Sequence, residues 1–219
     1  MKILKLLTAA LLIFTGGCAS VRPPVLSFLE PKVRQALTVN PHRAQARLIA
    51  WQRVDDAWKK ILGPVDATIG RNGFAPKEEK MEGDGRTPSG TFKIDRAFGY
   101  DAVVPTGLAY KQVSANDFWI DDPVSSEYNT WVVGQPQANS FERLKRDDDL
   151  YRQAIIIEYN TAPIIAGAGS AIFLHIWRNK HAPTAGCVAV SPKNIKRLLT
   201  WLDRFQNPVI ILGNDATAD

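Results

Sequence analysis

Residues 170–190 have the sequence SAIFLHIWRNKHAPTAGCVAV, which contains two short strand patterns joined by a loop. In the first pattern, apolar residues at positions 172, 174 and 176 alternate with Phe173, His175 and Trp177. The two sets point to opposite faces of a strand. In the second pattern, residues 187–190, the valines face the core and Cys187 faces the other way. A hairpin-like return of the chain would bring the His175 imidazole beside the Cys187 thiol.

A helix is predicted directly after the second strand. Ser191 is a preferred N-cap residue, and Pro192 suits the first helical position. Apolar residues at positions 195, 198, 199, 202 and 205 repeat at helical spacing and predict a core-facing stripe. Asn207 and Pro208 end this helix, and residues 209–212 predict a closing strand.

The rest of the chain is dominated by strand and turn patterns. We expect a hairpin over residues 46–62, strands at 64–70 and 154–159, a loop at 80–90 leading into a strand, and a charged helix at 141–152. These patterns predict a mainly β fold with a few helices (α+β). The expected architecture is a β-sandwich or open barrel with one well-defined helix after Cys187.

The composition indicates one soluble globular domain with additional segments. The chain has 219 residues, of which 45% are hydrophobic and 22% charged. The net charge of +5 is mild and the basic residues are scattered, so no nucleic-acid partner is predicted. No Cys/His cluster has metal-ligand spacing, so we expect neither a metal nor another cofactor.

The N-terminus has the pattern of an export signal. Two lysines precede an apolar stretch, residues 6–14, that is too short to span a bilayer. Residues 1–18 resemble a bacterial lipoprotein signal in which Cys18 is lipidated; an ordinary cleaved signal peptide is the alternative. Ser20 fits sorting to the outer membrane rather than retention at the inner membrane. We therefore expect the periplasmic face, with a lipid anchor in the outer membrane, or otherwise a soluble periplasmic protein.

The domain boundaries follow from these patterns. Residues 19–43 are predicted to form a tether, residues 44–213 the folded domain and residues 214–219 a tail. If Cys18 is lipidated or removed, Cys187 has no partner. An odd cysteine in an exported protein indicates a reactive thiol or an intermolecular bond, and the alternative is a buried small hydrophobe.

His175, Gly186 and Cys187 have the residue types of a nucleophile site. The thiolate is the reactive form of cysteine, and an adjacent imidazole can take the thiol proton. Gly186 leaves room for a substrate carbonyl and for backbone N–H groups that stabilise an oxyanion. The alternative for His175 is a hydrogen-bonded core histidine between aromatic neighbours.

Two motifs resemble those of the L,D-transpeptidase (YkuD-type) family. His175 followed by Thr184-x-Gly186-Cys187 matches the family's histidine and S/T-x-G-C, and residues 83–92, GDGRTPSGTF, match G-D-x-x-T-P-x-G-x-F. The resemblance covers residues 44–213. It implies a β-rich fold and a cysteine acyl-enzyme mechanism on peptidoglycan stem peptides. The thiolate would attack the carbonyl between diaminopimelate and D-alanine, and an amine would resolve the thioester.

The resemblance also implies roles for individual residues. Cys187 would be the nucleophile and His175 the general base and acid. Gly186 would contribute to the oxyanion site with the Cys187 N–H, and the backbone carbonyl of Ile176 would orient the histidine. The chain departs from the frequent S-H-G-C-x-R form of the motif, because alanines stand at positions 185 and 189.

Substrate-binding residues are less defined by the sequence. Arg178, in the loop before Cys187, is hypothesised to bind a substrate carboxylate in place of the missing arginine, or else is simply exposed. Thr184, Tyr159 and Asn160 are further predicted substrate-binding residues.

The expected partners are stem peptides and, through the lipid anchor, the outer or inner membrane. With water as acceptor the same thioester gives an L,D-carboxypeptidase or endopeptidase. A non-catalytic wall-binding lipoprotein is the alternative from another class.

Overall fold

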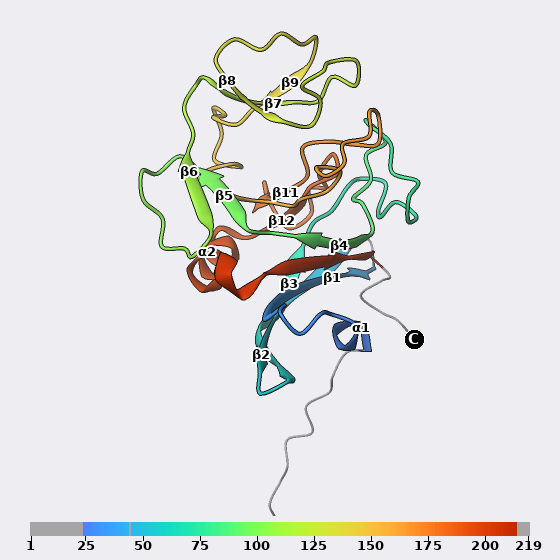
Figure 1. Cartoon of the computed structure of the whole chain (residues 1–219), viewed down its shortest axis with the longest axis vertical. Coiled ribbons are helices and arrows are strands. Elements are labelled where there is room, and N and C mark those ends of the chain that lie inside the picture. Colours follow the sequence, from blue (N-terminus) through green and yellow to red (C-terminus); the bar gives the residue numbers. More distant parts are fainter. Residues whose placement is uncertain (1–23, 44, 214–219) are drawn as a thin grey trace, which may run out of the picture.

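The computed structural model describes residues 24–43 and 45–213. Their strands form two five-stranded sheets and one three-stranded sheet (Figure 1). The first sheet has the order β3-β2-β1-β13-β4, the second β12-β11-β10-β5-β6 and the third β8-β7-β9. The mainly β class predicted from the sequence is confirmed, and the sheets do not close into a barrel.

The element bounds in the first sheet are β1 Gln35–His42, β2 Gln45–Val54, β3 Ala57–Ala67, β4 Gly90–Lys93 and β13 Val209–Leu212. Those in the second are β5 Arg96–Gly99, β6 Ala109–Gln112, β10 Gln153–Ile156, β11 Phe173–Ile176 and β12 Val188–Val190. Those in the third are β7 Asp117–Ile120, β8 Trp131–Val133 and β9 Phe141–Arg143. The helices are α1 Pro24–Ser27, α2 Pro192–Trp201 and the 3₁₀ helix η1 Arg204–Gln206.

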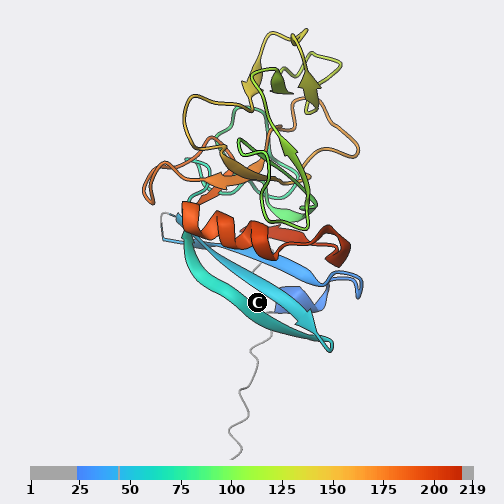
Figure 2. The same ribbon diagram turned by 90° about the vertical axis from the view of Figure 1, so that its left-hand side faces the viewer.

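The main core lies between the first two sheets and helix α2 (Figure 2). Leu37 and Ile210 reach it from the first sheet, and Leu174 and Val188 from the second. Helix α2 adds Ile195 with its buried leucines. The alternation predicted for residues 172–176 and 187–190 is therefore confirmed, since the even-numbered positions enter this core.

A second core covers the opposite face of the second sheet. The side chain of Phe173 makes edge-to-face contacts with Phe98 and Trp119, each with ring centroids 5.2 Å apart. Trp119 belongs to β7 in the three-stranded sheet, which we call the cap sheet (β7, β8 and β9). The cap sheet forms the third layer of the molecule, on the side away from the first sheet (Figure 2). Cys187 lies in this second core.

The predicted tether over residues 19–43 is wrong in its C-terminal part. Strand β1 pairs in parallel with β13 and antiparallel with β2, at the centre of the first sheet. Ala36 packs in one core on one face of β1, and Leu37 and Val39 in another on the other face. A strand buried on both faces lacks the alternation that marks a half-buried strand, which explains the error.

Three local predictions also need correction. The charged helix expected at 141–152 is strand β9 followed by turns. Residues 64–67 continue β3 instead of forming a separate strand. Helix α2 begins as predicted, with the Ser191 side chain accepting from the Asn194 N–H, but it ends at Trp201. Phe205 lies beyond it in η1 and is 79% exposed, so it is not part of the core-facing stripe.

Substitution of Leu37 tests whether β1 belongs to the folded domain. Leu37 is 0% exposed, so Leu37→Ala is expected to lower the free energy of unfolding by about 2–5 kcal/mol. Val133→Ala is the control, because Val133 is 64% exposed on β8 and its substitution should change stability by less than about 0.5 kcal/mol. Urea unfolding measures both. Equal unfolding midpoints for the two variants would indicate that residues 35–42 belong to the tether and not to the folded domain.

Candidate active site

Strands β11 and β12 run parallel, which corrects the expected hairpin-like return. His175 lies opposite Ala189 in this pairing, and the Phe173 N–H donates to Cys187 Sγ at 3.3 Å. Cys187 and His175 therefore share one face of the sheet, two positions apart along the strands, or about 7 Å. The long intervening segment, residues 177–187, supplies the crossover that a parallel connection needs.

The loop that holds Cys187 is fixed by its own hydrogen bonds. Thr184 Oγ1 donates to the Cys187 carbonyl at 2.6 Å and accepts from the Gly186 N–H at 3.2 Å. The Thr184 hydroxyl is thus used within the loop, and the structure does not bring it to a substrate position. Thr184 instead shapes the turn that presents the thiol.

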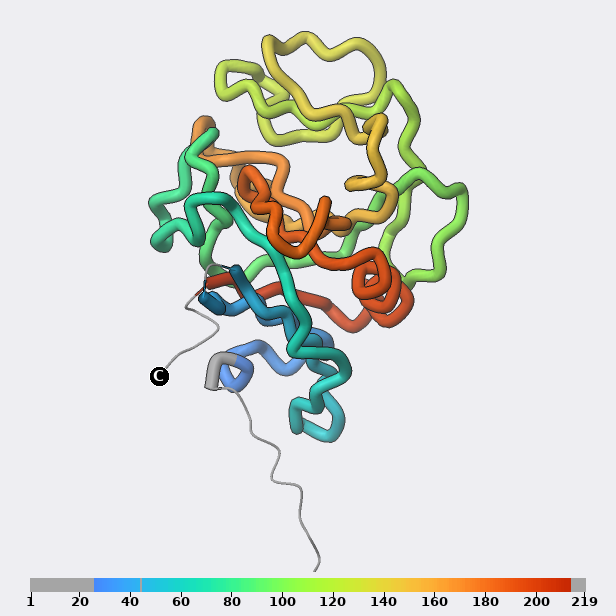
Figure 3. Tube along the Cα trace, turned by 180° about the vertical axis from the view of Figure 1, so that it is seen from behind, coloured from blue at the N-terminus to red at the C-terminus, as the bar shows by residue number. Residues whose placement is uncertain are grey.

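The second sequence motif packs directly behind this loop. A Cβ added at Gly186 would lie 3.1 Å from the Arg86 carbonyl oxygen and 3.3 Å from Ile172 Cδ1. Thr87 accepts from the Gly70 N–H at 2.9 Å, and Gly70 bridges to Thr184. Gly186 therefore leaves room for the close approach of the Arg86 backbone, which a larger residue would have to displace slightly. Figure 3 shows the chain around residue 70 passing beside the loop that precedes β12.

His175 is held by the carbonyl predicted to orient it. Nδ1 of the ring lies 2.8 Å from the Ile176 carbonyl oxygen. Because a carbonyl only accepts, Nδ1 carries the proton and Nε2 is left to accept one. The side chain is 6% exposed, and burial lowers the pKa of His175 to about 4, more strongly than the Ile176 contact raises it. The imidazole is therefore neutral at pH 7.

The Cys187 thiol is buried and protonated in the free protein. Its side chain is 7% exposed, and Sγ donates to the Ala171 carbonyl at 3.3 Å. Burial raises the pKa of Cys187 to about 12, and the nearby Glu142 carboxylate acts in the same direction. The Phe173 N–H acts the other way, because it donates to Sγ and stabilises the thiolate. Histidine and cysteine are thus both uncharged at rest.

Tyr151 connects the thiol, the histidine and the cap sheet. Its ring packs edge-on against the His175 ring, with centroids 5.1 Å apart. Its hydroxyl donates to Glu142 Oε2 at 2.5 Å. Burial, followed by the Glu142 charge, raises the pKa of Tyr151 well above its usual value, so the phenol stays protonated. Tyr151 therefore lies between the sheet that carries the nucleophile and a carboxylate from β9.

Sγ lies beside a small cavity of about 170 Å³ that is lined by charged groups. Three carboxylates line it: Glu82 accepts from the Tyr128 and Ser170 hydroxyls, while Asp121 and Glu142 come from the cap sheet region. Burial raises the pKa of Asp121 and that of Glu142. Two basic residues, Arg71 and Lys80, line the same cavity, which is completed by backbone around Gly186.

The structure separates several predicted substrate-binding residues from this cavity. Tyr159 and Asn160 line a different cavity, of about 1020 Å³, and their side chains bond to the backbone of residues 165–169. Arg178 is exposed. The hydrogen bond from Arg146 is the main cause of the lowered pKa of Asp148, and the charge of Arg178 adds to it. Tyr159, Asn160 and Arg178 do not line the cavity at Cys187.

The charged lining of the Cys187 cavity was missed at the sequence level. Lys80 and Glu82 lie just before the G-D-x-x-T-P motif, and this proximity was the one available signal for them. Asp121 and Glu142 follow no motif, and only the folding of the cap sheet over the second sheet brings them to the thiol. Cys18 and the predicted signal segment lie outside the described residues.

The described residues hold neither a metal-binding cluster nor a membrane-spanning helix. In residues 24–43 and 45–213, no group of three or more His, Cys, Asp or Glu side chains is arranged to hold a metal ion. Over the same part of the chain, every helix is too short or too polar to cross a membrane.

Fold and site define a mainly β protein with a thiol and a histidine on one sheet face, beneath a cap sheet. Residues 34–211 match the family model of the YkuD L,D-transpeptidase catalytic domain. The chain therefore belongs to this family of peptidoglycan enzymes. The match begins just ahead of β1, in agreement with the corrected domain boundary.

Solved structures similar to the chain include two of the helical cell shape determining protein Pgp2 from Campylobacter jejuni. The K307A mutant is 14% identical, with a TM-score of 0.43 over 82% of this chain and 46% of that chain. The other Pgp2 structure is 13% identical, with a TM-score of 0.42 over 86% of this chain and 53% of that chain. This chain thus matches about half the length of Pgp2. No curated protein matches it.

Proposed function

We propose that this protein is a cysteine-dependent L,D-transpeptidase that acts on peptidoglycan stem peptides through a Cys187 thioester. The observation that carries the proposal is the position of Cys187 Sγ, at a cavity and on the same sheet face as the neutral His175. Family membership supports the substrate class.

The proposed reaction assigns a role to Cys187 Sγ and to His175 Nε2. Sγ attacks the carbonyl carbon between diaminopimelate and D-alanine, and the thiol proton passes to His175 Nε2. The imidazolium then returns that proton to the leaving D-alanine nitrogen, and the C–N bond breaks to leave the thioester. An acceptor amine attacks the thioester and releases the thiol.

The oxyanion formed on attack requires a backbone donor. The Gly186 N–H already donates to Thr184 Oγ1 at 3.2 Å, so the Cys187 N–H is the remaining donor of the predicted pair. Because the free thiol has a pKa of about 12, proton transfer to His175 is unfavourable before substrate enters. In the proposed reaction the thiol therefore loses its proton only as Sγ forms its bond to the substrate carbonyl carbon.

Intact-protein mass spectrometry tests this proposal. After mixing with a disaccharide-tetrapeptide, the protein is expected to carry an adduct equal to the peptide minus D-alanine, and Cys187→Ala is expected to carry none. Added D-amino acid should convert the adduct to an exchanged tetrapeptide. Release of tripeptide alone would instead identify an L,D-carboxypeptidase.

A non-catalytic wall-binding protein is the second candidate, and the burial of the thiol favours it. It predicts binding of the tetrapeptide without an adduct and without turnover in folded protein. That result would overturn the enzymatic proposal.

The location of the protein is a further part of the proposal. A periplasmic protein with a lipid anchor at Cys18 fits a peptidoglycan substrate. We expect fatty-acid labelling of the full chain but not of a Cys18→Ala chain. Equal labelling of both chains would contradict a lipid anchor at Cys18.

A further inference from the structure

The cavity at Cys187 is too small to hold a stem peptide. Its volume of about 170 Å³ is below the roughly 300–1,000 Å³ of typical ligand sites. A peptide that places its reacting bond at Sγ must therefore extend into a neighbouring part of the surface.

A second cavity, of about 770 Å³, has a suitable size and shares the lining residue Arg71 with the first. Arg71 lines both cavities, and His181 and Pro183 reach the second from the loop before Cys187. The backbone around Arg71 pairs with this loop: the Arg71 N–H donates to the Thr184 carbonyl at 3.0 Å. The second cavity therefore begins beside the segment that presents the nucleophile.

The ionisable side chains that line the second cavity are all basic. They are Arg43, Arg71, Lys77 and His181, all exposed, and its lining includes no Asp or Glu. Within the described ranges, Arg43, Arg71 and Lys77 form no ion pair. These cations are consequently available to an anionic ligand.

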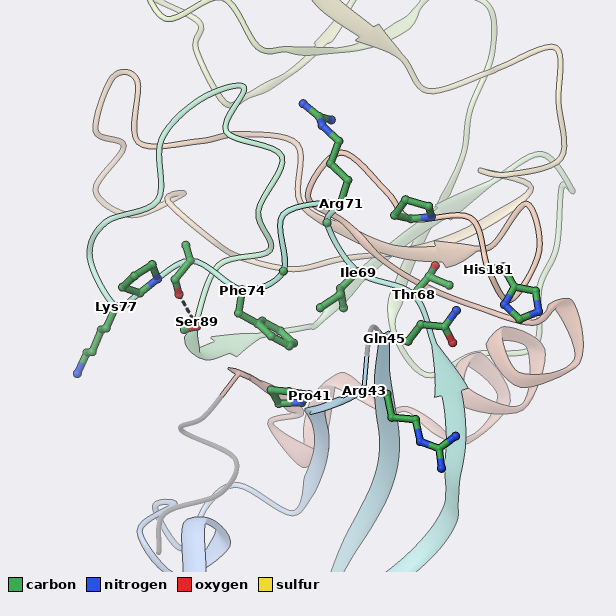
Figure 4. A pocket seen from close by; sticks show the side chains of 15 residues that line it. Pro41, Arg43, Gln45, Thr68, Ile69, Arg71, Phe74, Lys77, Ser89 and His181 are labelled. Atoms are coloured by element: carbon green, nitrogen blue, oxygen red, sulfur yellow. Dashed lines mark hydrogen bonds between the residues drawn. The ribbon is translucent and has the colours of Figure 1, made fainter.

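The floor of this cavity is apolar. Figure 4 shows Phe74 and Pro41 between Lys77 on one side and Arg43 and His181 on the other. An apolar floor with basic groups at its edges fits an extended chain that combines aliphatic carbon with spaced carboxylates.

The larger cavity of about 1020 Å³ fits such a ligand less well. Two of its cations are already neutralised, because Arg96 pairs with Glu158 at 2.7 Å and Lys93 pairs with Asp95. Lys80, which also lines the larger cavity, pairs with Asp84, and the unpaired Lys77 lines both cavities. A carboxylate that enters the larger cavity away from Lys77 therefore competes with ion pairs that already exist.

We propose that the cavity between Arg43, Arg71, Lys77 and His181 binds the carboxylate-bearing part of the donor stem peptide that lies outside the reacting bond. This subsite rests on the proposed function, because it takes the same peptide as the Cys187 cavity. Arg71 lies at the junction, where the chain of the ligand passes from one cavity to the other.

Titration of a disaccharide-tetrapeptide into Cys187→Ala protein tests the subsite without turnover. Arg43→Gln/Lys77→Gln in this background is expected to raise the Kd roughly tenfold at low salt, as loss of two exposed charge contacts would. Lys59→Gln/Lys60→Gln is the matched control, because it makes the same charge change at exposed positions of β3, outside the cavities described here. It should change the Kd less than twofold.

A peptide with its non-reacting carboxylates amidated provides a second readout. Its Kd is expected to be the same for the Arg43→Gln/Lys77→Gln protein and its parent. An unchanged Kd for the unmodified peptide would overturn the subsite, while a Cys187-dependent adduct in the otherwise unaltered chain would leave the proposed function standing. Absence of both binding and adduct in the parent proteins would overturn both.

Discussion

Iodoacetamide is expected to modify Cys187 of the free protein at least about a thousandfold more slowly than it modifies an unhindered cysteine at pH 7. The thiolate is the nucleophile, and the thiol pKa of about 12 lies more than three units above the usual value of about 8.5. Each unit lowers the thiolate fraction tenfold. Burial of the sulfur slows access further.

The time course of mass addition to a Cys18→Ser chain measures this rate for Cys187 alone. The rate should still rise between pH 9 and pH 11, where an ordinary cysteine has levelled off. Glu142→Gln is expected to speed the reaction, because it removes a negative charge that raises the thiol pKa. Glu79→Gln, at an exposed position, is the control and should leave the rate unchanged.

Modification faster than that of a free cysteine at mildly acidic pH would contradict the neutral resting pair. The unpaired cysteine in an exported chain predicts a reactive thiol. The structure reverses that expectation for the free protein, while the same burial leaves His175 neutral and able to accept a proton.

Local sequence patterns correctly predicted two features of the site: the sheet face of its residues and the start of the following helix. Alternation over residues 172–177 correctly assigned His175 and Cys187 to one sheet face, and Ser191 correctly located the start of α2. Alternation has the same period in parallel and antiparallel strands. It therefore did not distinguish the observed parallel pairing of β11 with β12 from a hairpin.

What the sequence did not specify depends on contacts between distant segments. Asp121 and Glu142 reach the thiol only because the cap sheet packs over Phe173. Strand β10 ends at Ile156, before the predicted end at residue 159, and Tyr159 and Asn160 lie in the following turn, which lines another cavity. No spacing rule connects these positions to residue 187.

His175→Asn is expected to slow formation of the Cys187 adduct by about 10²–10⁴-fold, the usual contribution of a general base. Asparagine retains an N–H donor for the Ile176 carbonyl but has no nitrogen that accepts the thiol proton. His42→Asn is the control, because His42 is exposed at the end of β1 and lines neither the Cys187 cavity nor the proposed subsite. Single-turnover mass spectrometry measures all three rates, and an unchanged rate in folded His175→Asn protein would remove His175 from the mechanism.

His175 should also affect how the free energy of unfolding depends on pH. The pKa of His175 is about 4 in the folded protein and about 6.5 when unfolded, so between these values only the unfolded chain binds the proton. The contribution of the neutral His175 to the free energy of unfolding is fully present above pH 6.5. It is lost as the pH falls toward 4, which lowers the free energy of unfolding by about 3 kcal/mol in total. Urea unfolding at pH 7 and pH 4.5 should show a smaller difference for His175→Asn than for His42→Asn. Equal differences would mean that the imidazole accepts a proton while buried, and the neutral base required at Cys187 would then be absent in mild acid.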